Sequence, residues 1–394
     1  MNKQLTKRRS LDEIQLARAF AIIAVLIVHS SSSGVTNLPP DTSLFPIYNF
    51  LNIAGKLGTP TFIMLSSFVL FYNYYPRQIT GTLIKKFYQK RIKFILIPYI
   101  LFSALYFGIK WYIYYDYPTL MDAFSKFIYL LALGKAHPHL YFVFISVQLY
   151  ILFPVLLILF KRFTFLRRNA LWIGLLIQWV WVYLNKNYFG ITLKGSISLS
   201  YMSFYFVGAY LGIYYEEIRA NMKNRSYKDK ILLPIFIAYG ALVILYTGYM
   251  YLVRINVYGT VAEHLPQFVN RYLAEFTWAT HALLAGLVLF YLSHLANKRF
   301  SSNVKTFFME IGATSFGIYL IHPMILMALR AYLPTGSPLY YTAWQIAAFF
   351  IMAFISWAIV RFTFTYVPHY WIIFGKLPER QRFKKVVHQE QQAN

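Results

Sequence analysis

The chain has 394 residues, of which 58% are hydrophobic, 20% are aromatic and only 13% are charged. A soluble domain has roughly a quarter of its residues charged, so this chain cannot cover a soluble globule, and its composition also excludes disorder, collagen and a coiled coil. The formal net charge of +25 would indicate nucleic-acid binding in a soluble protein, but in a membrane protein it is typical of basic cytoplasmic loops, and no nucleic-acid partner is expected.

Apolar runs of about 20 residues, the length that crosses the hydrocarbon core of a bilayer, recur along the whole chain. The first run carries Arg18 and His29 and lacks a small-residue cleavage site, so it is expected to be a retained helix and not a signal peptide. The predicted fold is an all-α polytopic membrane protein. We expect ten membrane-spanning helices, at residues 14–33, 52–75, 94–115, 139–160, 169–188, 199–215, 231–253, 272–293, 310–332 and 342–365.

The distribution of Lys and Arg predicts how these spans are oriented. The two ends of the chain and every second connection contain 27 of the 38 Lys and Arg residues, whereas the intervening loops contain 4. Because basic residues collect in cytoplasmic loops, both termini are expected in the cytoplasm. Residues 1–376 are predicted to form one transmembrane domain and residues 377–394 a basic cytoplasmic tail. The semi-apolar segment 119–135 is predicted to be an interfacial helix on the outer face.

The first predicted span contains two ionisable residues, Arg18 and His29. They are 11 residues apart, which on an α-helix is about 20° past three turns and about 16.5 Å along the axis, so both lie on one face. Arg18 lies near the cytoplasm, where it could hold a phosphate or carboxylate, and His29 lies deeper, where it could deprotonate a hydroxyl. Alternatively, Arg18 pairs with Asp12 or Glu13 as a topology anchor, and His29 bonds a helix carbonyl.

The ninth predicted span carries a polar stripe. Ser315, Tyr319 and His322 are spaced i, i+4 and i+7, which places them on one face that must point into the bundle. Pro323 removes the hydrogen bond to the carbonyl of Tyr319 and is expected to kink the helix. The stripe either forms hydrogen bonds between helices or lines the same cavity as His29.

The densest basic cluster is the cytoplasmic connection 77–93, which ends in Lys90, Arg91 and Lys93. Its simplest interpretation is ordinary positive-inside charge. Its functional interpretation is a docking surface for a nucleotide-type anion from the cytoplasm.

The remaining ionisable residues of the spans have simpler interpretations. His137 and His139 open the fourth span at i and i+2, so they do not share a helix face, and no metal site is expected there. Arg271 and Glu275 in the eighth span form an i, i+4 pair that is expected to be neutral, and His281 is a minor cavity candidate. The chain contains no cysteine and no motif of a P-loop, serine hydrolase or zinc protease.

Six motifs follow one another along the predicted spans. They are Arg18-x10-His29, Gly58–Ser66, Arg91–Ile–Lys93, His139–Phe142 with Gln148, Tyr150 and Pro154, Phe204–Tyr210, and Tyr319–Pro323. Taken together, they resemble the membrane-bound acyltransferase 3 family, multi-span enzymes that acylate cell-surface glycans, and the resemblance covers residues 11–376. Within the family, Ile95–Tyr99, Gly208–Tyr210 and Phe374–Lys376 look most like the branch that acts on the staphylococcal intercellular-adhesion polysaccharide, which is regarded as an O-succinyltransferase and was earlier proposed to be an exporter.

The resemblance implies a donor and a set of site residues. The donor is acetyl-CoA or succinyl-CoA bound from the cytoplasm, with no permanently bound cofactor. His29 is implied as the catalytic residue, Arg18 as its essential partner, and Arg91 and Lys93 as donor contacts. Lys93 replaces an Arg of the family motif, which keeps the charge but loses the bidentate fork, and Ser67 replaces a Gly. The substrate cavity is expected to contain Ser66, His139, Tyr141, Gln148, Ser315, Tyr319 and His322.

The expected function is therefore that of a multi-pass O-acyltransferase of the bacterial cytoplasmic membrane. It would move an acetyl or succinyl group from cytoplasmic acyl-CoA to a hydroxyl of a cell-surface or lipid-linked glycan, with the lipid bilayer and polysaccharide synthase subunits as further partners. The alternative is an exporter of a polysaccharide or lipid-linked sugar, although the chain has no inverted repeat of the kind that most secondary transporters show. A membrane scaffold for a synthase would leave Arg18 and His29 unexplained.

Overall fold

The computed structural model describes residues 11–114, 117, 119–334 and 337–377, and within these residues every regular element is a helix. The fold class predicted from composition is therefore confirmed. The elements are α1 (Asp12–Asn37), α2 (Phe45–Ala54), α3 (Gly58–Tyr74), α4 (Gly81–Arg91), η1 (Ile92–Leu96), α5 (Ile97–Tyr114), α6 (Leu120–Ala132), η2 (Pro138–Leu140), α7 (Tyr141–Arg162), α8 (Thr164–Arg168), α9 (Ala170–Leu184), η3 (Asn185–Phe189), η4 (Lys194–Ser196), η5 (Ser198–Tyr201), α10 (Met202–Ile213), α11 (Tyr215–Asn221), α12 (Arg225–Arg254), α13 (Tyr258–Ala262), α14 (Gln267–Arg299), α15 (Ser302–Arg330), α16 (Pro338–Tyr366) and α17 (Trp371–Phe374).

Eight helical stretches of the described chain are long and apolar enough to cross a membrane, which makes the chain a multi-pass membrane protein. The other two of the ten predicted spans, 169–188 and 199–215, coincide with shorter helices. One is α9, whose last turn becomes the polar π-helical segment η3, and the other is α10, which has 12 residues and is almost wholly buried. The count of ten spans stays a prediction. The eight stretches are Asp12–Asn37, Phe45–Tyr74, Gly81–Tyr114, Pro138–Arg162, Arg225–Arg254, Gln267–Arg299, Ser302–Arg330 and Pro338–Tyr366.

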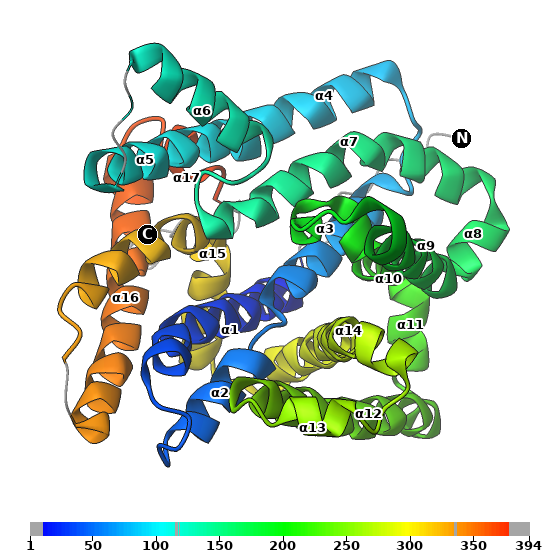
Figure 1. The fold of residues 1–394 in the computed structure, drawn as a ribbon. Coiled ribbons are helices and arrows are strands. Elements are labelled where there is room, and N and C mark those ends of the chain that lie inside the picture. Colours follow the sequence, from blue (N-terminus) through cyan, green and yellow to red (C-terminus); the bar gives the residue numbers. More distant parts are fainter. Residues whose placement is uncertain (1–10, 115–116, 118, 335–336, 378–394) are drawn as a thin grey trace, which may run out of the picture.

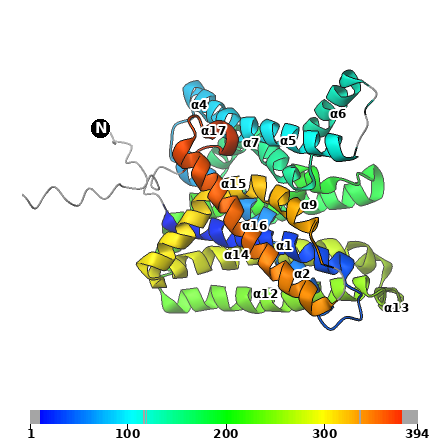
Figure 2. The same cartoon turned by 90° about the vertical axis from the view of Figure 1, so that its left-hand side faces the viewer.

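Helix α1 is the central helix of the bundle and packs against α2, α3, α14, α15 and α16. In Figure 1 it lies between α4 and α5 at one edge and α12 at the opposite edge. Figure 2 shows α1, α12 and α14 running in nearly the same direction, with the first turn of α1 and the short helix α17 toward the same side of the bundle.

A glycine allows α1 to approach its main partner α15. Gly312 of α15 lies so close to α1 that a Cβ built on it would overlap the backbone carbonyl of Gln15. Small residues at a helix contact are typical of membrane bundles, in which close packing replaces the hydrophobic effect. This contact fixes the relative position of the two helices that carry Arg18, His29, Ser315, Tyr319 and His322.

The basic connection 77–93, which the sequence predicts to be a loop between two spans, is largely the helix α4. Thr80 starts it, because its side-chain oxygen accepts a hydrogen bond from the backbone N–H of Leu83 at 3.1 Å. The helix continues through the π-helical turn η1 into α5, so the chain runs as one helical stretch from Gly81 to Tyr114. No proline or glycine interrupts the connection between Thr82 and Leu96, which is why the helix persists.

Two further expectations concern single elements. The segment 119–135 forms the helix α6, which packs against α5 at the edge of the bundle (Figure 1) and leaves most of its apolar side chains exposed. Its place at the membrane surface stays a prediction. Helix α15 continues without a break through Pro323, and the expected kink likewise stays a prediction.

The expected pairing of Arg271 with Glu275 is wrong. Glu275 forms its ion pair with Lys194, while Arg271 donates a hydrogen bond to the backbone carbonyl of Lys186 at 2.7 Å. The segment between α9 and α10 lies against the start of α14 and supplies both partners. A contact between segments so far apart in the chain is not visible in an i, i+4 spacing.

Candidate functional site

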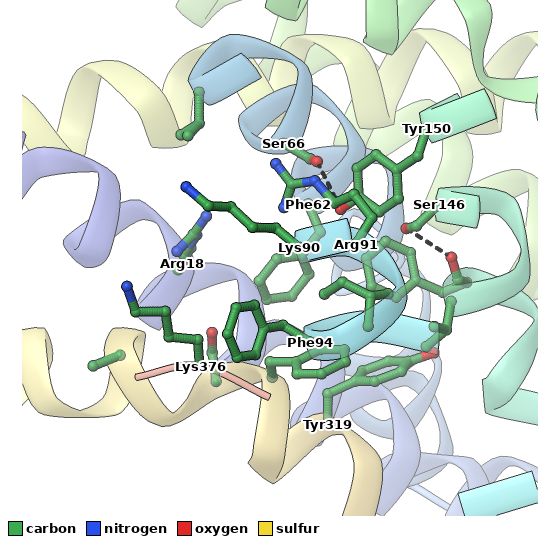
Figure 3. Close-up of a pocket in the computed structure, with 17 residues that line it drawn as sticks. Arg18, Phe62, Ser66, Lys90, Arg91, Phe94, Ser146, Tyr150, Tyr319 and Lys376 are labelled. Carbon is green, nitrogen blue, oxygen red and sulfur yellow. Dashed lines mark hydrogen bonds between the residues drawn. The ribbon is translucent and has the colours of Figure 1, made fainter. Parts of the chain in front are cut away.

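A cavity of about 330 Å³ lies where α1, α3, α4, η1, α7 and α15 meet. It is located between the two main groups of buried side chains, one around α3, α7 and α10 and one around α1, α5, α15 and α16. Its lining, drawn in Figure 3, mixes cations with aromatic and small polar side chains. The lining residues are Arg18, Phe62, Ser66, Val69, Lys90, Arg91, Phe94, Ile95, Phe142, Val143, Ser146, Tyr150, Ala313, Ser315, Phe316, Tyr319 and Lys376.

Four cations from three separate parts of the chain converge on this cavity. Arg18 comes from α1, Lys90 and Arg91 from the end of α4, and Lys376 from the segment after α17. Figure 3 shows the charged ends of Arg18, Lys90 and Lys376 gathered on one side of the cavity. Among the described residues, those that line the cavity include no carboxylate. Such a concave, positively charged site favours an anionic ligand.

The alternative role of Arg18 as an anchor requires an ion pair with Asp12 or Glu13, and both carboxylates contact other residues. Asp12 lies 3.2 Å from Nζ of Lys305. Glu13 accepts hydrogen bonds from the hydroxyl of Tyr215 and from the side-chain amide of Asn297. Arg18 instead lines the cavity.

The two cations of the Arg91–Ile–Lys93 motif have different surroundings. The guanidinium of Arg91 lies 4.7 Å from the ring centroid of Tyr150 and lines the cavity. The ammonium of Lys93 lies 4.1 Å from the ring centroid of Trp371, and Lys93 is not among the lining residues. Residues two apart on a helix point in different directions, so the motif supplies one cation to the cavity. Lys90, one position before Arg91, supplies the second.

Aromatic side chains form the inner end of the cavity. The rings of Phe62 and Phe142 are 5.8 Å apart, and those of Phe142 and Tyr319 are 5.2 Å apart. The Tyr319 hydroxyl donates a hydrogen bond to the backbone carbonyl of His139. This contact ties α15 to the start of α7 and holds the Tyr319 ring between the cavity and a group of histidines.

Four histidine rings follow one another beyond Tyr319. The ring centroids of His29 and His322 are 4.9 Å apart, those of His322 and His139 are 5.8 Å apart, and those of His139 and His137 are 4.8 Å apart. The Nδ1 atoms of His137 and His139 lie at hydrogen-bond distance, 2.7 Å. Burial, with smaller contributions from Lys110 and His29, lowers the pKa of His137 to about 4, so this ring is neutral at physiological pH.

The polar stripe of α15 is buried, as its spacing predicts. Ser315 lines the cavity and donates a hydrogen bond to the carbonyl of Gly312 at 2.8 Å. His322 lies about two turns after Ser315, where its Nδ1 lies 3.0 Å from the carbonyl of Ile318. Tyr319 thus forms a hydrogen bond to a neighbouring helix, and Ser315 and Tyr319 line the cavity, which His29 and His322 do not.

The other predicted cavity residues separate into two groups. Ser66 lines the cavity, and its hydroxyl lies 3.4 Å from that of Tyr150. Tyr141 and Gln148 do not line it. The Tyr141 hydroxyl lies 3.0 Å from that of Thr59, and Gln148 holds the segment before α10 through hydrogen bonds of 2.8 and 2.9 Å. Both residues belong to the family motifs, but their hydrogen bonds are to other parts of the protein and not to the cavity.

One candidate residue was not singled out by the sequence. Arg330, at the end of α15, donates hydrogen bonds of 2.8 Å to the backbone carbonyl of His29 and to the hydroxyl of Ser32. Arg330 therefore fixes the turn of α1 that carries His29. A signal was available, because loop charge predicts that this end of the span lies on the outer side, where the positive-inside pattern disfavours arginine.

The comparisons with known proteins agree with the family suggested by the motifs. The model of a family described as an acyltransferase domain matches residues 11–372. A probable poly-beta-1,6-N-acetyl-D-glucosamine export protein of Staphylococcus epidermidis is 27% identical over 339 residues, covering 83% of this chain and 84% of the relative. A protein of the same description from Staphylococcus aureus is 26% identical over 288 residues, or 70% of each chain. No solved structure matches the chain significantly.

Proposed function

The chain belongs to the acyltransferase family whose model matches residues 11–372, and from this premise we propose that it is an O-acyltransferase that uses acyl-CoA. The donor binds from the cytoplasm, and the acyl group, acetyl or succinyl, passes to a hydroxyl of a surface or lipid-linked glycan. The similarity to staphylococcal proteins described as exporters of poly-beta-1,6-N-acetyl-D-glucosamine makes a polymer of that sugar the first acceptor to test. The bacterial cytoplasmic membrane is the proposed location, and synthase subunits are proposed partners.

The observation that carries this proposal is the cavity with its four cations and its inner end beside the histidines. Arg18, Lys90, Arg91 and Lys376 suit the phosphates of coenzyme A, since guanidinium and ammonium groups form charge-assisted hydrogen bonds to phosphate. The apolar and aromatic lining further in suits the uncharged pantetheine arm. The thioester at the end of that arm would then lie near Tyr319, the lining residue that contacts His322.

His29 is the proposed base. It comes from the same helix as Arg18 but lies on the side of the histidine group away from the cavity, and its side chain is half-buried. In the transfer step, the hydroxyl oxygen of the glycan forms a bond to the thioester carbonyl carbon and the C–S bond breaks. His29 takes the hydroxyl proton, which makes the oxygen nucleophilic, and the proton finally resides on the sulfur of coenzyme A.

Cleavage of the thioester distinguishes this function from export. Purified wild-type protein is given acyl-CoA and a β-1,6-linked N-acetylglucosamine oligosaccharide, and release of free thiol and acylation of the sugar are both measured. We expect both products from the wild type and a loss of about 10²- to 10⁴-fold in His29→Ala, the range for removal of a general base. Thiol release by His29→Ala at the wild-type rate, or no acylation by the wild type, would contradict the proposal.

A matched control is available in the same chain. His281 is fully buried on α14 and its ring lies between those of Tyr239 and Tyr246, away from the cavity lining. His281→Ala removes an imidazole that is more deeply buried than that of His29 and is expected to keep the wild-type rate in folded protein. If only His29→Ala loses activity, the loss reflects the removal of the proposed base and not the destabilisation that follows from removing any buried ring.

A further inference from the structure

We propose that His322 is a second proton-transfer residue, which carries the proton from His29 on the acceptor side to the leaving sulfur on the donor side. This inference rests on the proposed function. The family resemblance implies only that His322 belongs to the substrate cavity. The position of its ring, between His29 and the cavity wall, indicates a role in proton transfer.

The ring of His322 contacts both sides of the site. Its centroid lies 4.9 Å from that of His29 and 5.9 Å from that of Tyr319. Tyr319 lines the donor cavity, whereas His29 does not. The side chain of His322 is fully buried, and that of His29 is half-buried. A proton that passes from the hydroxyl to the donor through these residues therefore meets His29 first and His322 second.

The hydrogen bonding of His322 fixes which ring nitrogen can take a proton. Its Nδ1 lies 3.0 Å from the backbone carbonyl of Ile318. A carbonyl oxygen only accepts, so Nδ1 carries the hydrogen in the neutral ring and Nε2 carries the lone pair. Nε2 is buried and has no hydrogen-bond partner in the described protein. A base oriented through its other nitrogen by a backbone carbonyl is the arrangement that proton transfer requires.

The shape of the site explains why one histidine does not both deprotonate the hydroxyl and protonate the leaving sulfur. The hydroxyl approaches from the outer side and the sulfur leaves toward the cytoplasmic cavity, with the ring of Tyr319 between that cavity and the histidines. The proposed step balances without any co-reactant. The C–O bond forms and the C–S bond breaks, His29 takes the hydroxyl proton, His322 receives it at Nε2, and the thiolate sulfur takes it to become the free thiol.

The leaving group provides the test. A coenzyme A thiolate is a basic leaving group that gains from protonation, whereas an aryl thiolate is much less basic and leaves without it. Wild type, His322→Asn, His29→Ala and the control His281→Ala are compared by kcat/KM with acetyl-CoA and with an acetyl aryl thioester. Asn is chosen because its amide N–H can still donate to the carbonyl of Ile318 while the Nε2 base is lost.

We expect the kcat/KM of His322→Asn to fall about 10²- to 10⁴-fold with acetyl-CoA and less than about tenfold with the aryl thioester. His29→Ala should lose activity with both donors, and His281→Ala with neither. Retained cleavage of the aryl thioester also shows that His322→Asn is folded. An equal loss of His322→Asn with both donors, or no loss with either, would overturn the role of His322. Failure of the wild type with acetyl-CoA would instead overturn the proposed function itself.

Discussion

Arg18 lies on the same helix as His29 and lines the cavity together with Lys90, Arg91 and Lys376, whereas His29 does not line it. The spacing of Arg18 and His29 could be predicted from the period of a helix because both belong to one element. The stacking of Lys93 on Trp371 could not, since it depends on where the chain returns after α16.

Replacement of Arg18 by Gln is expected to weaken donor binding. The guanidinium lies among other cations at the cavity, so its loss should raise the KM for acyl-CoA about tenfold, as expected for loss of one charge-assisted hydrogen bond, with a smaller effect on kcat. The matched control is Lys93→Gln, whose side chain lies outside the cavity and whose KM should change less than about twofold. Steady-state kinetics over a range of donor concentrations measure both. A fall in kcat at unchanged KM in Arg18→Gln would contradict a docking role.

At the scale of elements, the contact of α1 with α15 positions the site. Arg18 and His29 belong to one helix and Tyr319 and His322 to the other, so the relative placement of the two helices sets the distance between the histidines. The sequence predicted both helices and the inward face of α15. The helix α4 was missed although Leu83, Ile84, Phe87 and Tyr88 recur at the spacing of one helix face, because the stretch was interpreted from its charge alone. Glu275 was assigned the wrong partner because the true one, Lys194, is far away in the chain.

Replacement of Gly312 by Ala is expected to disturb this contact. A Cβ at this position would overlap the backbone carbonyl of Gln15, and backbone on both sides cannot move aside at low cost. Overpacking of this kind costs about 1–3 kcal/mol, so the thermal unfolding temperature in detergent should fall and the acyl transfer rate with it. Gly240→Ala is the control, because nothing lies within 4 Å of a Cβ at that position on α12. Equal unfolding temperatures for the two variants would contradict the assigned role of the contact.

At the scale of the whole molecule, the charge distribution predicts which face of the bundle lies toward the cytoplasm. The first turn of α1, the end of α4 and α17 lie toward one side of the bundle (Figure 2), and the segments predicted to be cytoplasmic contain 27 of the 38 Lys and Arg residues. The fold class follows from composition because the bilayer imposes it, and the orientation stays a prediction from loop charge. Of the seven expected cavity residues, Ser66, Ser315 and Tyr319 line the cavity. The rest of its lining could not be predicted, since it comes from helices that are distant in sequence.

The orientation can be tested directly because the chain has no cysteine of its own. Lys223 and Glu263 are exposed and lie beyond opposite ends of α12. Each is replaced by Cys, and intact cells are treated with a maleimide that cannot cross the membrane. We expect Glu263→Cys to be labelled in intact cells and Lys223→Cys only after the membrane is opened. The reverse pattern would place the cationic cavity on the outer face and contradict cytoplasmic donor binding.

The central claim is that the acyl group enters from the cytoplasmic side and reaches a glycan on the other side through His29. The most direct measurement uses sealed membrane vesicles of known orientation, loaded with a glycan oligosaccharide and supplied from outside with labelled acyl-CoA, which does not cross the membrane. Inverted vesicles with the wild-type protein should form labelled glycan in their interior, whereas right-side-out vesicles and inverted vesicles with His29→Ala should not. Labelled glycan in right-side-out vesicles, or in the His29→Ala vesicles at the wild-type rate, would contradict the claim.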